Sequence, residues 1–213
     1  MEYEVVAKNI VHFPGAILNA KSIIDTVENT SIKGVGDWLP WLSHGDDDPH
    51  QYGMLKQLDI SKLEAEPKTA IRDLVQDAIN EINETLDLCF ATYYRYLGID
   101  ETAINNCIYA HKKDRPSHIA IKKYFVGEEL GPHPDWDGDE PTVFTASVYF
   151  NSDYSGGQLS FPDIGVSVAT QAGSVVIFPS ATIHESLRVD SGDKYVTSIM
   201  GAVPKSMVAH LLQ

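Results

Sequence analysis

The sequence has few cysteines, no long apolar run and little positive charge for its length of 213 residues. Its two cysteines, Cys89 and Cys107, stand in no CxxC or other metal-binding spacing, so reduced, buried thiols are expected. No apolar run approaches the roughly 20 residues that a membrane helix needs. The first residues also lack the basic start and apolar block of a signal peptide. These absences predict a soluble cytoplasmic protein without a membrane partner.

The charge balance is strongly acidic. The chain has 16 Lys and Arg against 30 Asp and Glu, which gives a formal net charge of −14. Such a surface repels phosphate backbones, so a general nucleic-acid binder is disfavoured and a neutral or basic partner is favoured. A compact basic cluster from His111 to Arg115 is expected to be a solvated turn. Nothing in the sequence specifies an oligomeric state.

The pattern of apolar residues along the chain changes near residue 100. Helical spacing of apolar residues predicts helices within residues 13–30 and 66–98. From residue 117 onward come seven or eight short runs rich in Val, Ile, Thr, Tyr and Phe, which is typical of a sandwich or barrel. The stretches at residues 151–157 and 171–173 are typical of hairpin turns. The expected fold class is α+β, with N-terminal helices packed on a β-sandwich.

The stretch PHPDW places two metal-ligand types two residues apart. Alternate residues of an extended backbone point to the same side, so His133 and Asp135 should converge, and Pro134 disfavours helix at His133. A third ligand must come from elsewhere, and His184 follows the very apolar run SVVIFP after a short polar turn. Two histidines and one carboxylate on one face form the facial triad typical of mononuclear non-haem Fe(II).

A cation downstream completes the pattern. Lys194 lies ten residues after His184, behind a turn at Gly192, and we expect its strand to run antiparallel beside His184. A fixed cation at the base of a metal pocket suits the far carboxylate of a chelating dicarboxylic acid. Arg188 is the competing cation, because strand alternation puts it on the same face as His184.

This ordered set resembles the 2-oxoglutarate- and Fe(II)-dependent dioxygenases, and within them the prolyl 4-hydroxylase branch. The resemblance runs from about Ile119 to Val203 and is carried by YFVGEELGPHPDW, SVYFN, YSGGQLSFP, QAGSVVIFP and HESLRVDSGDKY. The resemblance hardly extends to residues 1–100. The tryptophan that the family often has on its last strand is absent near Met200.

The resemblance implies a double-stranded β-helix, or jelly roll, with the N-terminal helices on its major sheet. It implies one catalytic domain over residues 1–213, with a helical support region at 1–100 and the jelly-roll core at 101–213. His133, Asp135 and His184 would bind Fe(II), Lys194 would pair with the far carboxylate of 2-oxoglutarate, and Tyr124 would assist it. Dioxygen is the oxidant, succinate and CO₂ are products, and ascorbate is a candidate reductant.

The substrate is less constrained than the chemistry. The leading hypothesis is hydroxylation of a peptidyl proline, with Trp136 and the loop from Trp38 to Trp41 as aromatic walls. Residues 38–53 are expected to form a loop, whose part 44–50 is expected to be mobile and acidic, with a lid over the pocket as the alternative. The alternative is a free amino acid or another small molecule, and a remote alternative is a non-enzymatic metal-binding jelly roll. Asp135 argues against the related halogenases, which carry a small residue there. The charge and the spacing to Lys194 disfavour the nucleic-acid dealkylases.

Overall fold

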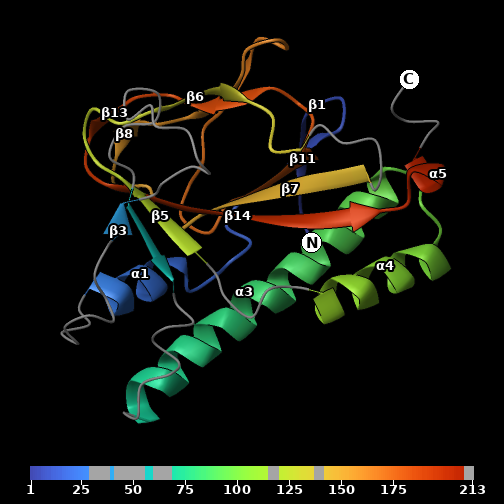
Figure 1. Ribbon diagram of the computed structural model, residues 1–213, viewed down its shortest axis with the longest axis horizontal. Coiled ribbons are helices and arrows are strands. Elements are labelled where there is room, and N and C mark those ends of the chain that lie inside the picture. The colour runs from blue at the N-terminus through green and yellow to red at the C-terminus, as the bar shows by residue number, and fades with distance from the viewer. Residues whose placement is uncertain (29–38, 41–55, 60–68, 115–119, 137–141, 209–213) are drawn as a thin grey trace.

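The computed structural model describes residues 1–28, 39–40, 56–59, 69–114, 120–136 and 142–208. Its framework is two facing antiparallel sheets with helices on one side (Figure 1). The large sheet has the strand order β1-β2-β11-β7-β14-β5-β4-β3, and the small sheet has the order β10-β9-β12-β6. A separate two-stranded ribbon pairs β13 with β8. Mostly antiparallel sheets in this arrangement are consistent with a jelly roll.

The strands of the large sheet are β1 (Glu4–Ala7), β2 (Ile10–Phe13), β3 (Leu39–Pro40), β4 (Lys56–Asp59), β5 (Ala120–Tyr124), β7 (Thr142–Tyr149), β11 (Val175–Pro179) and β14 (Lys194–Val203). Those of the small sheet are β6 (Leu130–His133), β9 (Leu159–Phe161), β10 (Val166–Val168) and β12 (His184–Ser186). The ribbon consists of β8 (Ser155–Gly156) and β13 (Val189–Ser191). The longest pairing joins β7 to β14 at the centre of the large sheet.

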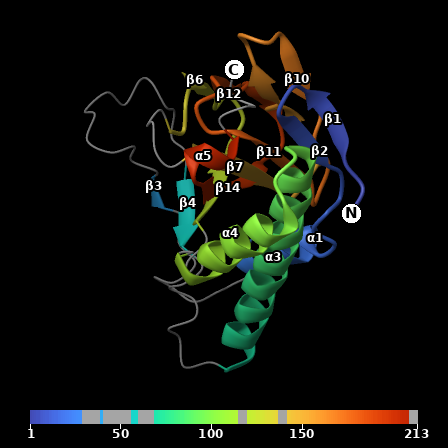
Figure 2. The ribbon, with the colours of Figure 1, turned by 90° about the vertical axis from the view of Figure 1, so that its right-hand side faces the viewer.

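The helices are α1 (Ala20–Glu28), α3 (Thr69–Tyr96), α4 (Glu101–Asp114) and the short α5 (Lys205–Val208). Figure 2 shows α3 and α4 side by side on the outer face of the large sheet. The Tyr93 ring of α3 lies 5.2 Å from that of Phe144 on β7, in an edge contact. In the part of the chain that the structure describes, no helix is both long and apolar enough to cross a membrane.

Local sequence explains where α3 ends and α4 begins. Gly98 adopts a φ of 78°, a left-handed conformation that glycine takes without steric cost and that ends a helix. Asp100 then caps α4, because its Oδ1 accepts hydrogen bonds from the backbone N–H groups of Thr102 at 3.0 Å and Ala103 at 3.1 Å. The two helices are thereby joined by a tight turn.

Strand β11 separates two hydrophobic cores. Val175 and Ile177 pack in the cluster shared with the helices, whereas Val176 and Phe178 pack in the cluster between the two sheets. Because consecutive strand residues face opposite sides, a strand buried on both faces must be apolar at every position. This accounts for the uninterrupted run SVVIFP.

Four sequence expectations differ from this fold. The first part of the chain also contains β1 and β2, and β2 pairs with β11 in the large sheet. Residues 111–114 end α4 rather than forming a turn. The stretches 151–157 and 171–173 are not hairpins, because β7 and β11 belong to one sheet and the strands beside them in sequence belong to others. Turn residues mark a chain reversal but do not specify which sheet the next strand joins.

Replacement of Phe144 by alanine should lower the free energy of unfolding by about 3–5 kcal/mol, because a large cavity opens where the ring contacts Tyr93 and Tyr94. Chemical denaturation measures the change. Leu88→Ala is the matched control on α3, since Leu88 is 59% exposed and its truncation should change stability little. Equal effects of the two substitutions would contradict the placement of α3 on the sheet.

Candidate metal centre

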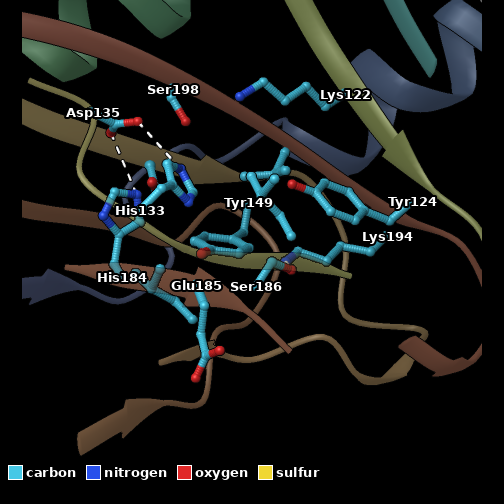
Figure 3. A pocket seen from close by; sticks show the side chains of 14 residues that line it. Lys122, Tyr124, His133, Asp135, Tyr149, His184, Glu185, Ser186, Lys194 and Ser198 are labelled. Atoms are coloured by element: carbon cyan, nitrogen blue, oxygen red, sulfur yellow. Dashed lines mark hydrogen bonds and ion pairs between the residues drawn. The ribbon is translucent and has the colours of Figure 1, made fainter. Parts of the chain in front are cut away.

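Two neighbouring strands of the small sheet bring the predicted ligands together. His133 ends β6, His184 begins β12, and the two residues are directly opposed in the antiparallel pairing of these strands. Asp135 follows β6, with its Oδ1 3.7 Å from His133 Nε2 and its Oδ2 3.5 Å from His184 Nε2. The three ligand atoms all lie within 4.8 Å of one another. Figure 3 shows the side chains converging on one point.

Backbone carbonyls orient both imidazole rings. His133 Nδ1 lies 2.7 Å from the carbonyl oxygen of Gly131, and His184 Nδ1 lies 2.9 Å from that of Thr182. A carbonyl only accepts, so each Nδ1 carries the proton and each Nε2 offers its lone pair toward Asp135. Phe178 packs against the His184 ring at a centroid distance of 4.6 Å. The rings are therefore preset for metal binding.

Two hydroxyl residues hold Asp135. Its backbone N–H donates to the Ser180 carbonyl at 2.8 Å, and Thr145 Oγ1 donates to its Oδ2 at 2.7 Å. The hydroxyls of Thr145 and Ser180 are themselves 2.7 Å apart. Burial would raise the pKa of Asp135, but its contacts with His133 and His184, the hydrogen bond from Thr145 and the charge of Lys122 outweigh burial and hold the pKa at about 2. The carboxylate is therefore ionised at neutral pH.

This donor set fits one metal ion. Two imidazole nitrogens and one carboxylate oxygen on one face are the ligands that mononuclear non-haem Fe(II) takes, with the remaining coordination positions left for other molecules. His133 and Asp135 are half-buried and His184 is buried. A pocket extends from the site, lined by Lys122, Tyr124, Leu130, His133, Asp135, Ser147, Tyr149, Leu159, His184, Glu185, Ser186, Lys194, Val196 and Ser198.

Lys194 lies at the far end of this pocket and is 1% exposed. Its Nζ donates to the Gly157 carbonyl at 2.7 Å and to Ser186 Oγ at 2.6 Å. The ammonium also lies 4.7 Å from the centre of the Tyr124 ring and 5.4 Å from that of Tyr149. Burial, and then the nearby charge of Lys122, lower the pKa of Lys194 to about 7. A carboxylate ligand would reverse this shift.

Tyr124 stands directly opposite Lys194 in the pairing of β5 with β14. It is 2% exposed, and burial raises the pKa of its hydroxyl well above the usual range. The phenol therefore stays protonated and can donate a hydrogen bond. In Figure 3 its hydroxyl points into the pocket on the same side as Lys194.

The predicted position of Lys194 relative to His184 was wrong in one respect. Its strand β14 pairs with β5 and β7 of the large sheet and not with β12, which belongs to the small sheet. Lys194 instead reaches across the space between the sheets, where it meets Ser186. The ten residues from His184 to Lys194 carry the chain from the small sheet to the large sheet and do not form a hairpin.

Arg188, the cation that competes with Lys194, and Trp136, the predicted substrate wall, both lie at the surface. Arg188 is exposed and is not among the residues that line the pocket, because β12 ends at Ser186 and the strand alternation stops there. Trp136 is 41% exposed beside Asp135 and does not line the pocket either. Met200 is 50% exposed on β14. Trp38, Trp41 and the stretch 44–50 lie outside the described residues.

Sequence reasoning missed several supporting residues. Thr145 and Ser180 come from β7 and from the turn after β11, so no local motif links them to Asp135. Lys122 could have been predicted from strand alternation, as His133 and Asp135 were. It lies two residues before Tyr124 on the same strand and therefore lines the same pocket.

Replacement of Thr145 by valine keeps the shape of the side chain and removes the hydrogen bond to Asp135. We expect Mn(II) to bind about 10–100-fold more weakly, as is usual when a group that orients a metal ligand is lost. Calorimetric titration measures the affinity. Thr102→Val on exposed α4 is the matched control. An unchanged affinity in Thr145→Val would show that this hydroxyl does not orient the ligand.

The lowered pKa of Lys194 predicts a pH dependence. Its ammonium form predominates below about pH 7 and is lost as the pH rises, whereas a bound carboxylate requires it. The affinity of the Zn(II)-loaded protein for 2-oxoglutarate should therefore fall by up to about tenfold per unit between about pH 7.5 and about pH 9. In Lys194→Met the affinity should be lower throughout and this slope absent. A slope that persists in the variant would assign the proton to another group.

Comparison with known proteins supports the chemistry of the site. The family described as the 2OG-Fe(II) oxygenase superfamily matches residues 119–199, which contain His133, Asp135, His184 and Lys194. A comparison with curated protein sequences gives no significant match.

Solved structures share the fold at low sequence identity. One is a prolyl hydroxylase from Trichoplax adhaerens in complex with a peptide fragment of the hypoxia inducible factor oxygen degradation domain, with 12% identity, a TM-score of 0.60, and coverage of 96% of this chain and 87% of that chain. A viral collagen prolyl hydroxylase from Paramecium Bursaria Chlorella virus-1 has 17% identity, a TM-score of 0.51 and coverage of 94% and 100%. A prolyl-4-hydroxylase from Pseudomonas putida has 14% identity, a TM-score of 0.53 and coverage of 93% and 94%.

The family match and the convergent His-Asp-His ligands agree on one assignment. Members of this family use Fe(II), 2-oxoglutarate and dioxygen. Residues 119–199 are similar to the 2OG-Fe(II) oxygenase superfamily, which supports assignment of the protein as a dioxygenase, and the fold of the chain is similar to that of prolyl hydroxylases.

Proposed function

We propose that the protein is a hydroxylase that acts on a peptidyl proline and that His133, Asp135 and His184 hold its Fe(II). The observation that carries the hydroxylase proposal is the shared pocket of the ligand triad and the buried Lys194. The proline part rests on the similarity of the fold to prolyl hydroxylases. It is an analogy of fold, because fold by itself does not determine substrate.

Different residues of the pocket would bind the metal and the co-substrate. With Fe(II) and 2-oxoglutarate bound, dioxygen would be the oxidant for a C–H bond, one of its oxygen atoms going to the substrate and the other to succinate, with CO₂ released. His133, Asp135 and His184 would hold the metal, and the chelating end of 2-oxoglutarate would bind to the same ion. Lys194 would neutralise the far carboxylate, and the Tyr124 hydroxyl would donate a hydrogen bond to it.

The surroundings of Lys194 favour that role. Its present partners are a carbonyl, a hydroxyl and two aromatic rings, and none of these carries a negative charge. A buried ammonium without a counter-ion is costly, so a bound carboxylate gains more here than at the surface. The neighbouring turn fits closely: a Cβ on Gly157 would stand 3.1 Å from Lys194 Cδ.

Two surface residues are candidates for contact with a peptide. Trp136 follows Asp135 directly and has an exposed ring, which suits packing against a proline ring. Arg188 is exposed, and its guanidinium lies near the turn at Gly127. We propose both as contacts of a bound peptide outside the metal pocket.

The test is incubation with Fe(II), 2-oxoglutarate and oxygen in the presence of proline-containing peptides, read by tandem mass spectrometry. We expect the mass of one oxygen atom to appear on a proline, with stoichiometric succinate. His184→Ala should abolish both, because one ligand of the triad is lost. Succinate formation that persists in His184→Ala would refute the metal assignment, and oxidation of no proline would refute the peptide assignment.

One observation favours the alternative of a free amino acid or another small molecule. A second lysine, Lys122, lines the metal pocket itself, where a charged group on the reacting molecule would lie. Turnover that one small molecule stimulates and no peptide stimulates would select this alternative.

A further inference from the structure

The side-chain amide of Asn151 binds the backbone on both sides of Lys194. Asn151 lies just after β7 and is 6% exposed. Its Oδ1 accepts a hydrogen bond from the backbone N–H of Tyr195 at 2.9 Å, and its Nδ2 donates to the carbonyl oxygen of Asp193 at 2.7 Å. Lys194 is the residue between these two. One buried side chain therefore fixes the backbone from which the Lys194 side chain enters the pocket.

The hydrogen bonds around Asn151 require an amide at this position. The Tyr195 N–H only donates, so it faces the acceptor Oδ1. The Asp193 carbonyl and the Asp153 carboxylate only accept, so both face Nδ2. A leucine would form none of these bonds, and an aspartate would bring its second oxygen against both acceptors. The amide is therefore matched to its three partners.

The loop 151–157 holds Lys194 at two points. Asn151, at the start of the loop, binds the backbone beside Lys194, and at its end the Gly157 carbonyl accepts a hydrogen bond from Lys194 Nζ at 2.7 Å. The same ammonium donates to Ser186 Oγ at 2.6 Å. A long side chain loses much rotamer freedom when it is ordered, so its end is well placed only where backbone and ammonium are both held.

The turn before Lys194 packs closely against the same loop. Gly192 adopts a φ of 73°, and a Cβ on Gly192 would stand 2.5 Å from the carbonyl oxygen of Asp153. The turn thus has little room in which to move. A displacement of the loop at Asn151 would therefore shift Lys194 as well, instead of being absorbed by the turn.

Asn151 acts on the pocket only indirectly. It is not among the residues that line the pocket. Within the described part of the chain, its side chain bonds to Tyr195, Asp193 and Asp153, and none of these is a metal ligand. An effect of Asn151 on the co-substrate must therefore pass through Lys194.

We propose that Asn151 is a positioning residue of the co-substrate site, which holds Lys194 where its ammonium meets the far carboxylate of 2-oxoglutarate. This inference rests on the proposed function, in which Lys194 neutralises that carboxylate, and adds a residue that acts through Lys194. Displacement of a preorganised group by about 1 Å can cost on the order of 100-fold. Loss of the Asn151 hydrogen bonds should therefore be measurable in the binding of 2-oxoglutarate.

The test compares two 2-oxo acids by calorimetric titration of the Zn(II)-loaded protein. 2-Oxoglutarate carries the far carboxylate, whereas 2-oxopentanoate has the same chain length and chelating end but a methyl group in its place. The ratio of the two dissociation constants therefore isolates the contribution of Lys194, and Lys194→Met gives the ratio without it. General loosening of the pocket would weaken both acids and leave the ratio unchanged.

In Asn151→Asp we expect the preference for 2-oxoglutarate over 2-oxopentanoate to fall by about tenfold or more, because the new carboxylate opposes the Asp193 carbonyl and the Asp153 carboxylate. The affinities for 2-oxopentanoate and for Mn(II) should change by less than about twofold. Asn106→Asp is the matched control, since it makes the same change of charge on the exposed face of α4 and should leave the ratio unchanged.

A double variant keeps the test decisive if Asn151→Asp does not fold. Asn151→Asp combined with Asp153→Asn removes the repulsion between two carboxylates and keeps an acceptor for the Tyr195 N–H. We expect it to recover part of the preference for 2-oxoglutarate. Its ratio should stay below that of the wild-type protein, because the Asp193 carbonyl still lacks its donor.

The inference is overturned if the ratio in these variants equals that of the wild-type protein, or if the two acids weaken together. Failure of the proposed function has a different signature. A wild-type protein that binds the two acids equally would refute the role of Lys194, and one that binds neither would refute the hydroxylase assignment. Either of these results would overturn the inference as well.

Discussion

The antiparallel pairing of β6 with β12 is the contact on which the site depends. It places His133 opposite His184. Asp135 follows the end of β6, and its carboxylate lies near both imidazole rings. Because the side-chain period of a strand is two, a register shift of one residue would move one imidazole to the other face of the small sheet. The apolar contacts of Phe178 and Phe161 under His184 hold that register. The apolar core between the sheets therefore helps to position the metal ligand His184.

The large sheet contributes the other half of the pocket. Its strands β5, β7 and β14 present Tyr124, Thr145 and Lys194 toward the small sheet while their alternate residues pack toward the helices. The metal ligands come from one sheet and their anchors and the buried cations come from the other. Separation of the sheets would remove the Thr145 hydrogen bond from Asp135 and the contact of Lys194 with Ser186, so stability and activity are linked through one interface.

The sequence predicted those parts of the site that depend on residues close together in the chain, and it missed those that depend on distant residues. His133 and Asp135 are neighbours in an extended segment, and their convergence needs only the geometry of two residues. His184 and Lys194 were assigned by their residue types and order, but the sheet to which Lys194 belongs depends on a crossover that spacing does not encode. Thr145 and Ser180 lie on strands distant in sequence, so only tertiary structure reveals their link to Asp135. Helix α4 was missed because its polar residues, among them Asn105, Asn106 and His111, weaken the helical pattern that α3 displays clearly.

The central claim is that His133, Asp135, His184 and Lys194 form one site for Fe(II) and 2-oxoglutarate. Anaerobic titration of the Fe(II)-loaded protein with 2-oxoglutarate tests it most directly, because chelation of Fe(II) by the 2-oxo acid produces a visible charge-transfer absorption. We expect a saturable absorption with one equivalent in the wild-type protein, weaker binding in Lys194→Met, and no absorption in His184→Ala. Absence of the absorption in the wild-type protein, or an undiminished absorption in His184→Ala, would contradict it.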